Sequence, residues 1–130
     1  MGLDMYLCGD VYIGVYDANR NCKPLPCLES ERYRLGYSRK HTNLHGFIVR
    51  TFAGGIDDCR EIPLSEADIQ KIMDAVRARV LPFTQGFFFG ASEGTPEEMA
   101  EDLEIFQRAL NWLRAADEPF WRSVIYQASW

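Results

Sequence analysis

The feature that most constrains the fold of this chain is a strict alternation of side chains over residues 3–16. Every odd position in this stretch is apolar or glycine. A repeat of two residues is that of a β-strand, in which successive side chains point to opposite faces of a sheet. We therefore expect one long strand, or a bent pair of strands, with the odd face toward the core. The even face is polar and aromatic and carries Asp4, Tyr6, Cys8, Asp10, Tyr12 and Tyr16.

Three later segments have the spacing of amphipathic helices. Apolar side chains recur at helical intervals in residues 38–52, and a glycine pair beginning at Gly54 ends that helix. A second helix is expected over residues 65–80, with a serine cap at its start and Pro82 after its end. A third, over residues 95–113, opens with the sequence Thr-Pro-Glu-Glu, which combines an N-cap, a first-turn proline and a capping box.

The remaining segments predict an α+β domain. Further strands are expected at residues 31–37, 60–62, 86–90 and 120–130, with a loop at 17–29. Strands at both ends of the chain with helices between them favour a mainly antiparallel sheet with about three helices packed on one face. The two terminal strands are then possible neighbours, and residues 1–130 form a single domain.

The charge of the chain argues against nucleic acid as a partner. It contains 19 acidic residues and 14 lysines and arginines, for a net charge of −5. Affinity for nucleic acid comes largely from cationic side chains that displace counterions from phosphates. We interpret the acidic run at residues 97–104 as a solvated helix face, with acids near the N-terminal end of the helix dipole. The alternative is that it mimics nucleic acid or meets a basic partner.

The sequence also predicts a cytoplasmic protein without a membrane partner. No apolar run approaches the roughly 18 residues of a membrane span, and the first residues lack a basic region followed by an apolar run. In such a chain the four cysteines are expected to be reduced thiols.

Five blocks of sequence carry a resemblance to a known family. They are MGLDMYL at the start, SRKHTNLHGFIV, GGIDDCREIPLS, LPFTQGFFFG and the closing YQASW. Together they resemble a family of small uncharacterised bacterial, phage and prophage proteins with a YWRKHPNLHG-like helix, a DDC turn and a final SW. Ser38 and Thr42 depart from the tryptophan and proline of that pattern, which puts the packing near this helix in doubt. The resemblance implies a bacterial or phage origin and a common fold, and it implies no reaction.

The two histidines suggest a metal site. His41 and His45 are four residues apart, so on a helix they share a face. With Cys22 and Cys27 they give the spacing C-x4-C-x13-H-x3-H, which is close to that of a zinc finger. A zinc finger usually lacks a core of its own, whereas this segment belongs to a larger domain. The alternative is that one or both histidines are core residues hydrogen-bonded to backbone or tyrosine.

Two other clusters could carry chemistry. Cys59 precedes an arginine and follows two aspartates, so with His45 nearby it could be an activated thiolate, or it could be a buried thiol in a turn. The two aspartates could bind a divalent cation, pair with a histidine, or cap the turn. Arg39 and Lys40 near the start of the first helix could hold an anion. The sequence contains none of the motifs of the common hydrolase, metalloprotease, nucleotide-binding or EF-hand families.

We therefore expect a non-catalytic binding protein, an accessory factor of bacterial, phage or prophage origin that binds a protein or a small ligand. The alternative is a small enzyme, either metal-dependent through His41 and His45 or thiol-based through Cys59, and a third possibility is an oligomeric assembly component. The expected ligand-binding residues are Asp4, Tyr6, Arg39, Lys40, His45, Tyr126 and Trp130, and all of them except Lys40 are expected to line one groove.

Overall fold

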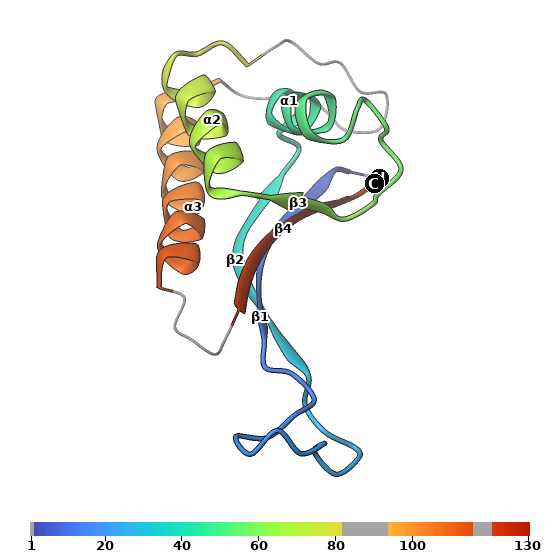
Figure 1. Cartoon of the computed structure of the whole chain (residues 1–130). Coiled ribbons are helices and arrows are strands. Elements are labelled where there is room, and N and C mark those ends of the chain that lie inside the picture. Colours follow the sequence, from blue (N-terminus) through green and yellow to red (C-terminus); the bar gives the residue numbers. More distant parts are fainter. Residues whose placement is uncertain (1, 82–93, 116–120) are drawn as a thin grey trace.

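The computed structural model describes residues 2–81, 94–115 and 121–130 of the chain, and it confirms an α+β fold (Figure 1). In that part of the chain three helices pack on a four-stranded antiparallel sheet. The strands are β1 (Asp4–Tyr12), β2 (Ser30–Arg39), β3 (Ile62–Leu64) and β4 (Trp121–Ser129), and the helices are α1 (Thr42–Phe52), α2 (Glu66–Arg77) and α3 (Pro96–Arg114). The strand expected at residues 86–90 lies outside the described residues.

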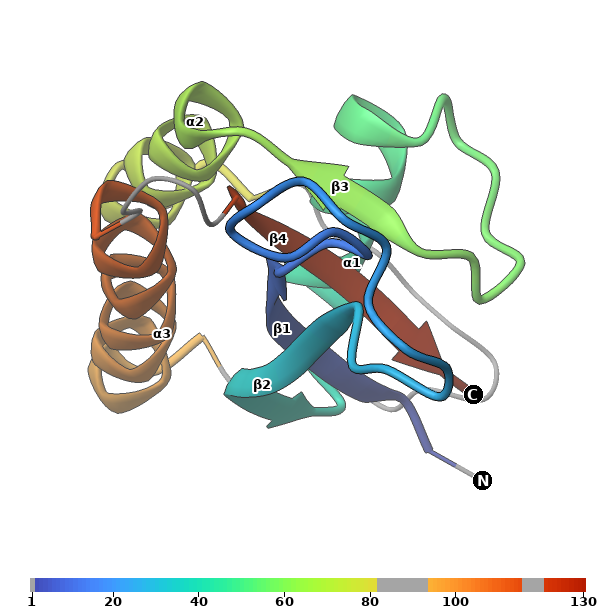
Figure 2. The ribbon, with the colours of Figure 1, turned by 60° about the horizontal axis from the view of Figure 1, so that its bottom comes forward.

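The two terminal strands are neighbours in the sheet, as the sequence predicts. The strand order is β2-β1-β4-β3, and every pairing is antiparallel (Figure 2). Between β1 and β4, Met5 pairs with Ala128 and Leu7 pairs with Tyr126, so these four side chains lie on one face. All four belong to a core that also contains residues from all three helices.

The odd face of β1 is buried as expected, but the strand is shorter than the alternation predicts. Leu3, Met5 and Leu7 are at most 3% exposed, whereas Val11 is only half-buried. The strand ends at Tyr12, where the chain leaves the sheet. Residues 13–29 form an arm that projects beyond the sheet, at the bottom of Figure 1, where no helix covers them.

The first helix begins later than expected. The sequence predicts a helix from residue 38, but Ser38 and Arg39 pair with β1 and extend β2. This pairing gives hydrogen-bond partners to backbone amides that the first turn of a helix would leave unpaired. The Lys40 amide likewise donates to the carbonyl of Leu3 at 2.9 Å. Helix α1 therefore starts at Thr42. The third strand is similarly displaced, to Ile62–Leu64 from the expected 60–62.

Two glycines let α3 lie close to the sheet. A Cβ atom on Gly9 would lie 2.6 Å from the ring of Trp112, and one on Gly36 would lie 2.3 Å from Ile105. Any larger residue at either position would push α3 away from the sheet. These contacts lie at the middle and at the C-terminal end of α3. None of the helices in the described part of the chain is long and apolar enough to cross a membrane.

Candidate functional site

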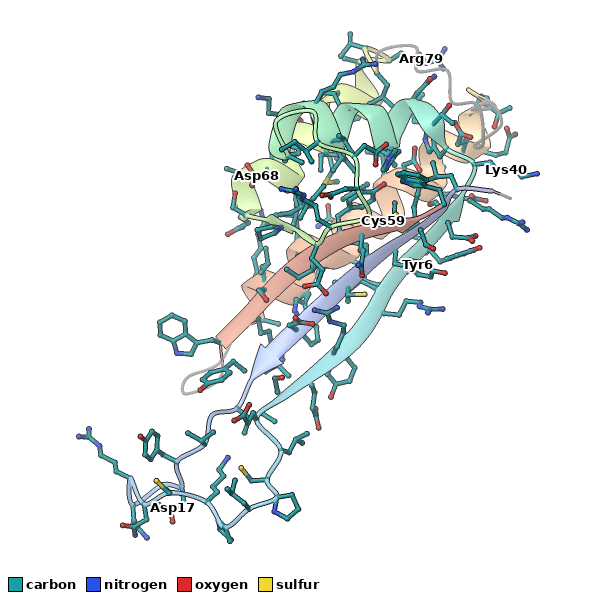
Figure 3. All side chains as sticks on the ribbon, turned by 90° about the vertical axis from the view of Figure 1, so that its right-hand side faces the viewer. Tyr6, Asp17, Lys40, Cys59, Asp68 and Arg79 are labelled. Carbon is teal, nitrogen blue, oxygen red and sulfur yellow. The ribbon has the colours of Figure 1, made fainter. Side chains whose placement is uncertain are left out.

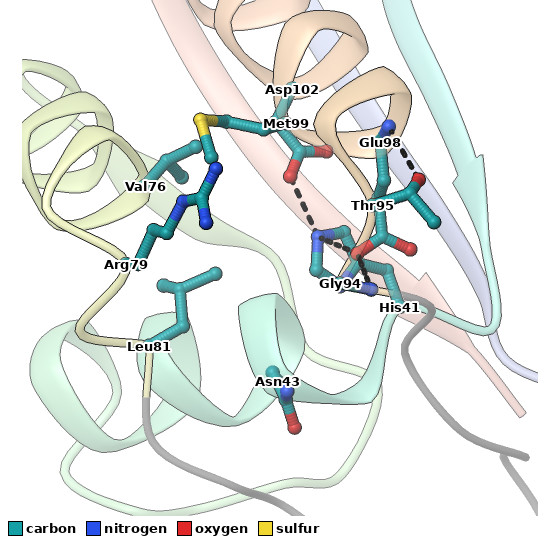
Figure 4. Close-up of a pocket in the computed structure, with 10 residues that line it drawn as sticks. All are labelled: His41, Asn43, Val76, Arg79, Leu81, Gly94, Thr95, Glu98, Met99 and Asp102. Carbon is teal, nitrogen blue, oxygen red and sulfur yellow. Dashed lines mark hydrogen bonds and ion pairs between the residues drawn. The ribbon is translucent and has the colours of Figure 1, made fainter.

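Two adjoining cavities lie where the end of β2 and the start of α1 meet α3. The first, here called the ligand cavity, has a volume of about 140 Å³ and lies between α1, α2 and α3 (Figure 4). The second, here called the outer cavity, has a volume of about 310 Å³. His41, Glu98 and Asp102 line both. The other residues of the ligand cavity are Asn43, Val76, Arg79, Leu81, Gly94, Thr95 and Met99.

His41 is the buried centre of this region. Lys40 adopts a left-handed backbone conformation with φ of 59°, which turns the chain out of β2 and makes His41 the N-cap residue of α1. The imidazole is 4% exposed, and its Nε2 lies 2.7 Å from Oδ2 of Asp102 and 3.5 Å from Oε1 of Glu98. The two carboxylates are four residues apart on α3, so both reach the same ring.

Asp102 is an unexpected member of the site. We expected the acidic run at residues 97–104 to be a solvated helix face, but Asp102 is only 3% exposed. Burial raises the pKa of its carboxyl above the usual value, and the hydrogen bond from His41 opposes that rise. A signal for its burial was present, because Asp102 lies three residues after Met99 and four before Phe106, on the apolar stripe of the helix.

Arg79 lies on the α2 side of the ligand cavity, and the sequence reasoning missed it. Helix α2 ends in a Schellman motif, in which the amide of Val80 donates to Ala75 at 3.1 Å and that of Arg79 donates to Val76 at 3.2 Å. Arg79 occupies the left-handed position of this motif, with φ of 56°, where glycine is the usual residue. Its guanidinium forms no ion pair with any carboxylate of the described residues.

The rest of the ligand cavity is largely apolar. Val76 and Leu81 lie on the Arg79 side of the cavity in Figure 4, and the Met99 side chain extends from α3 toward Arg79. Polar groups placed at the two ends of an apolar cavity are the usual arrangement of a small-ligand site, because the apolar wall excludes water and the polar groups fix orientation. The arrangement is suited to holding a small molecule with charged groups at both ends.

Three of the expected ligand-binding residues lie on the sheet face away from the helices. Asp4 accepts a hydrogen bond from the Tyr37 hydroxyl at 2.5 Å and lies 3.6 Å from the guanidinium of Arg39. Tyr6 packs against Tyr37, with ring centroids 5.4 Å apart, and the guanidinium of Arg34 lies 5.1 Å above it. Of this group Arg39 also lines the outer cavity, together with the expected residue Lys40.

The other three form a separate network on the helix-covered side. His45 is buried, with Nδ1 2.6 Å from the hydroxyl of Tyr126 and Nε2 2.9 Å from Oδ1 of Asp57. The indole of Trp130 donates to the same Asp57 oxygen at 3.2 Å. This confirms the interpretation of His45 as a core histidine bonded to tyrosine, and burial raises the pKa of Tyr126 well above its usual value.

The expectation that one groove contains all of these residues except Lys40 is therefore wrong. Tyr126 pairs with Leu7 and shares its buried face, whereas Asp4 and Tyr6 occupy the alternate positions of β1 and point to the opposite face. The sheet itself separates the two groups. Sequence alone left this open, because it does not determine which face of β4 meets the core face of β1.

The four-residue metal site suggested by the spacing is not formed among the described residues. Cys22 and Cys27 lie in the arm, whose position Asp17 marks in Figure 3, at the far end of the molecule from Lys40 and α1. No group of three or more His, Cys, Asp or Glu side chains in the described part is placed to hold a metal ion. The histidines themselves point to different partners, Asp102 for His41 and Asp57 for His45.

Cys59, the alternative nucleophile, has little space beside it. It lines a cavity of about 10 Å³ together with His45 and Asp57. A cavity of about 10–15 Å³ is the smallest that holds one water molecule, so this cavity itself does not enclose a substrate. The backbone at Cys59 is left-handed, with φ of 63°, which is consistent with the expected turn.

Comparisons of the chain with protein-family models, curated proteins and solved structures find no similar protein. The resemblance to bacterial and phage proteins therefore stays a prediction. What the protein does has to be inferred from the geometry of its own residues.

Proposed function

We propose that the protein is a non-catalytic binding protein that takes a small polar ligand in the ligand cavity. The observation that carries this proposal is the position of Arg79, which lines the cavity without a carboxylate partner among the described residues, across from the buried pair of His41 and Asp102. The resemblance to phage and prophage proteins supports an accessory role, and we include that role in the proposal.

The backbone at Arg79 supports a functional reason for its side chain. A left-handed conformation costs an L-residue about 1–2 kcal/mol, and glycine avoids that cost. The chain nevertheless has arginine at this position of the α2 terminus. Since no described carboxylate pairs with the guanidinium, the fold itself gains little from its charge. A bound anionic group is the missing partner that this arrangement best accommodates.

The lining of the ligand cavity supports binding over catalysis. Among its described residues there is no cysteine, serine or lysine that could act as a nucleophile. The hydroxyl of Thr95 accepts a hydrogen bond from the backbone amide of Glu98 at 3.1 Å and caps the helix. The geometry gives the two enzyme alternatives less support, since His41 and His45 have different partners and the cavity beside Cys59 measures only about 10 Å³. We therefore propose that His41 and Asp102 contribute to the shape and polarity of the cavity.

The proposal is tested by screening small polar metabolites for binding, first by thermal shift and then by isothermal titration calorimetry. We expect hits that bind the wild-type protein and bind the Arg79→Gln variant at least tenfold more weakly. The matched control is Arg77→Gln, because Arg77 lies on the same helix and its side chain pairs with Asp74 at 3.5 Å. Binding that is unaffected by Arg79→Gln, or turnover of a hit by the purified protein, would contradict the proposal.

A further inference from the structure

The charges of the ligand cavity are divided between its two sides. Arg79 comes from the end of α2, whereas Glu98 and Asp102 come from α3 and lie toward His41 (Figure 4). Val76, on α2, contributes apolar surface to the same cavity. A ligand that satisfies both sides therefore carries an anionic group and a cationic group, separated by a short apolar or neutral connection.

The ligand cavity itself encloses only a few atoms of a ligand. The cavity measures about 140 Å³. In a well-studied engineered protein an apolar cavity of about 150 Å³ accommodates benzene, which has six carbon atoms. Small α-amino acids such as glycine, alanine and serine are of this size, and their carboxylate and ammonium groups are attached to the same carbon atom.

A singly charged ligand fits the lining less well. A simple carboxylate placed against Arg79 would leave the two acidic side chains facing it across a small space, and like charges there are unfavourable. A simple amine placed against Glu98 and Asp102 would leave the guanidinium without an anion. A zwitterion avoids both costs, since each of its charges lies beside the opposite charge of the protein.

We propose that the ligand cavity binds a small amino acid, with its carboxylate paired to Arg79 and its ammonium group against Glu98 and Asp102. This inference rests on the proposed function, because it names the class of ligand for the same cavity. The buried His41 then serves as a positioning residue, which holds the Asp102 carboxylate at 2.7 Å and thereby fixes the ammonium side of the site.

The test is calorimetric titration of the wild-type protein with glycine, alanine and serine, alongside acetate, ethylamine and phenylalanine as controls. We expect at least one of the three small amino acids to bind at least tenfold more tightly than any control. Acetate and ethylamine each lack one charge, and phenylalanine exceeds the volume of the cavity.

Two variants separate the two ends of the ligand. Arg79→Gln removes the partner of the carboxylate, and Glu98→Gln removes one partner of the ammonium group while keeping an acceptor for the Gly94 amide. Each is expected to weaken amino-acid binding at least tenfold. The control Glu104→Gln, on the same helix but outside both cavities, is expected to change binding less than twofold.

The outcomes distinguish this inference from the proposed function on which it rests. If acetate or another simple carboxylate binds as tightly as the amino acids and Arg79→Gln weakens it, the cavity binds ligands but the amino-acid class is wrong. If no small amino acid binds while a different metabolite does so through Arg79, the class is again wrong. If no small molecule binds through Arg79 at all, both the inference and the proposed function are overturned.

Discussion

Replacing Arg79 by glycine is expected to make the protein more stable and at the same time to weaken ligand binding. Arg79 lies at the left-handed position of the Schellman motif that ends α2, with φ of 56°. Its side chain is exposed, so the substitution removes little packing. Stability and binding then change in opposite directions, which a substitution that merely damages the fold does not produce.

The size of the stability change follows from the backbone. An L-residue pays about 1–2 kcal/mol for the left-handed conformation, and glycine gives back about 0.5–1 kcal/mol through its greater freedom in the unfolded chain. The net gain is about 0.5–1 kcal/mol, which corresponds to a rise in Tm of about 2–4 °C for a domain of this size. The control Ala78→Gly changes the preceding residue, whose φ is −78°, and is expected to destabilise by about 0.5–1 kcal/mol.

Urea denaturation followed by circular dichroism measures the stability of the three proteins, and titration calorimetry with the ligand found for the wild type measures binding. We expect Arg79→Gly to raise the midpoint of denaturation and to weaken binding at least tenfold. A lower midpoint for Arg79→Gly would show that the arginine contributes to the fold, which would refute the reasoning about its backbone. Unchanged affinity would refute its role in the site.

Three further predictions concern the core and the acidic side of the site. His45→Ala is expected to lower the free energy of unfolding by about 2–4 kcal/mol, because it leaves a cavity and removes the buried hydrogen bond to Tyr126 and the partly buried one to Asp57. Arg50→Ala, on the exposed side of the same helix, is expected to change the stability in urea little, and equal effects of the two substitutions would contradict the buried network. Gly9→Ala is expected to lower the free energy of unfolding by about 1–3 kcal/mol, because the new methyl group meets the ring of Trp112. The loss in Tm should be smaller when Gly9→Ala is combined with Trp112→Leu. A Tm equal to that of the wild type would show that α3 moves aside without cost. Burial raises the pKa of Asp102 in the folded protein above 3.8, its value in the unfolded chain. Above pH 3.8 the folded protein therefore binds more protons than the unfolded chain. The stability that this carboxyl contributes falls as the pH rises through the folded-state pKa. Asp102→Asn is therefore expected to gain stability relative to the wild type as the pH rises above 3.8, measured by urea denaturation at a series of pH values. A constant difference, or one that changes in the opposite direction, would contradict the raised pKa.

The fold could be predicted from local patterns to a considerable extent. The odd residues of β1 are buried, the Ser65 and Thr95 caps are both formed, and the terminal strands are adjacent. These features depend on interactions between residues close in sequence or on a simple repeat of polarity. The start of α1 was wrong because pairing with a distant strand competes there with a local helical pattern.

The candidate site was much less predictable. His41 was recognised as a residue of interest, but its expected partners were Cys22 and Cys27, which are in the arm. Its actual partner Asp102 is 61 residues away in the chain and belongs to an acidic run typical of a surface. Arg79 carries no motif, because its importance comes from its backbone conformation and from the cavity it faces.

The sequence by itself determined the types of the elements, the buried faces of β1 and of the helices, and the helix caps, because those properties arise from the alternation of side chains and from hydrogen bonds within one turn. Only the tertiary structure decided that β1 lies between β2 and β4 and that α2 and α3 enclose a cavity next to His41. It also decided that His45 and Tyr126 lie on the face of the sheet opposite Asp4 and Tyr6. The physical reason is that burial and long-range pairing are properties of the whole packed chain. An aspartate on a helix is a surface residue or a buried partner of histidine depending on what packs against that helix.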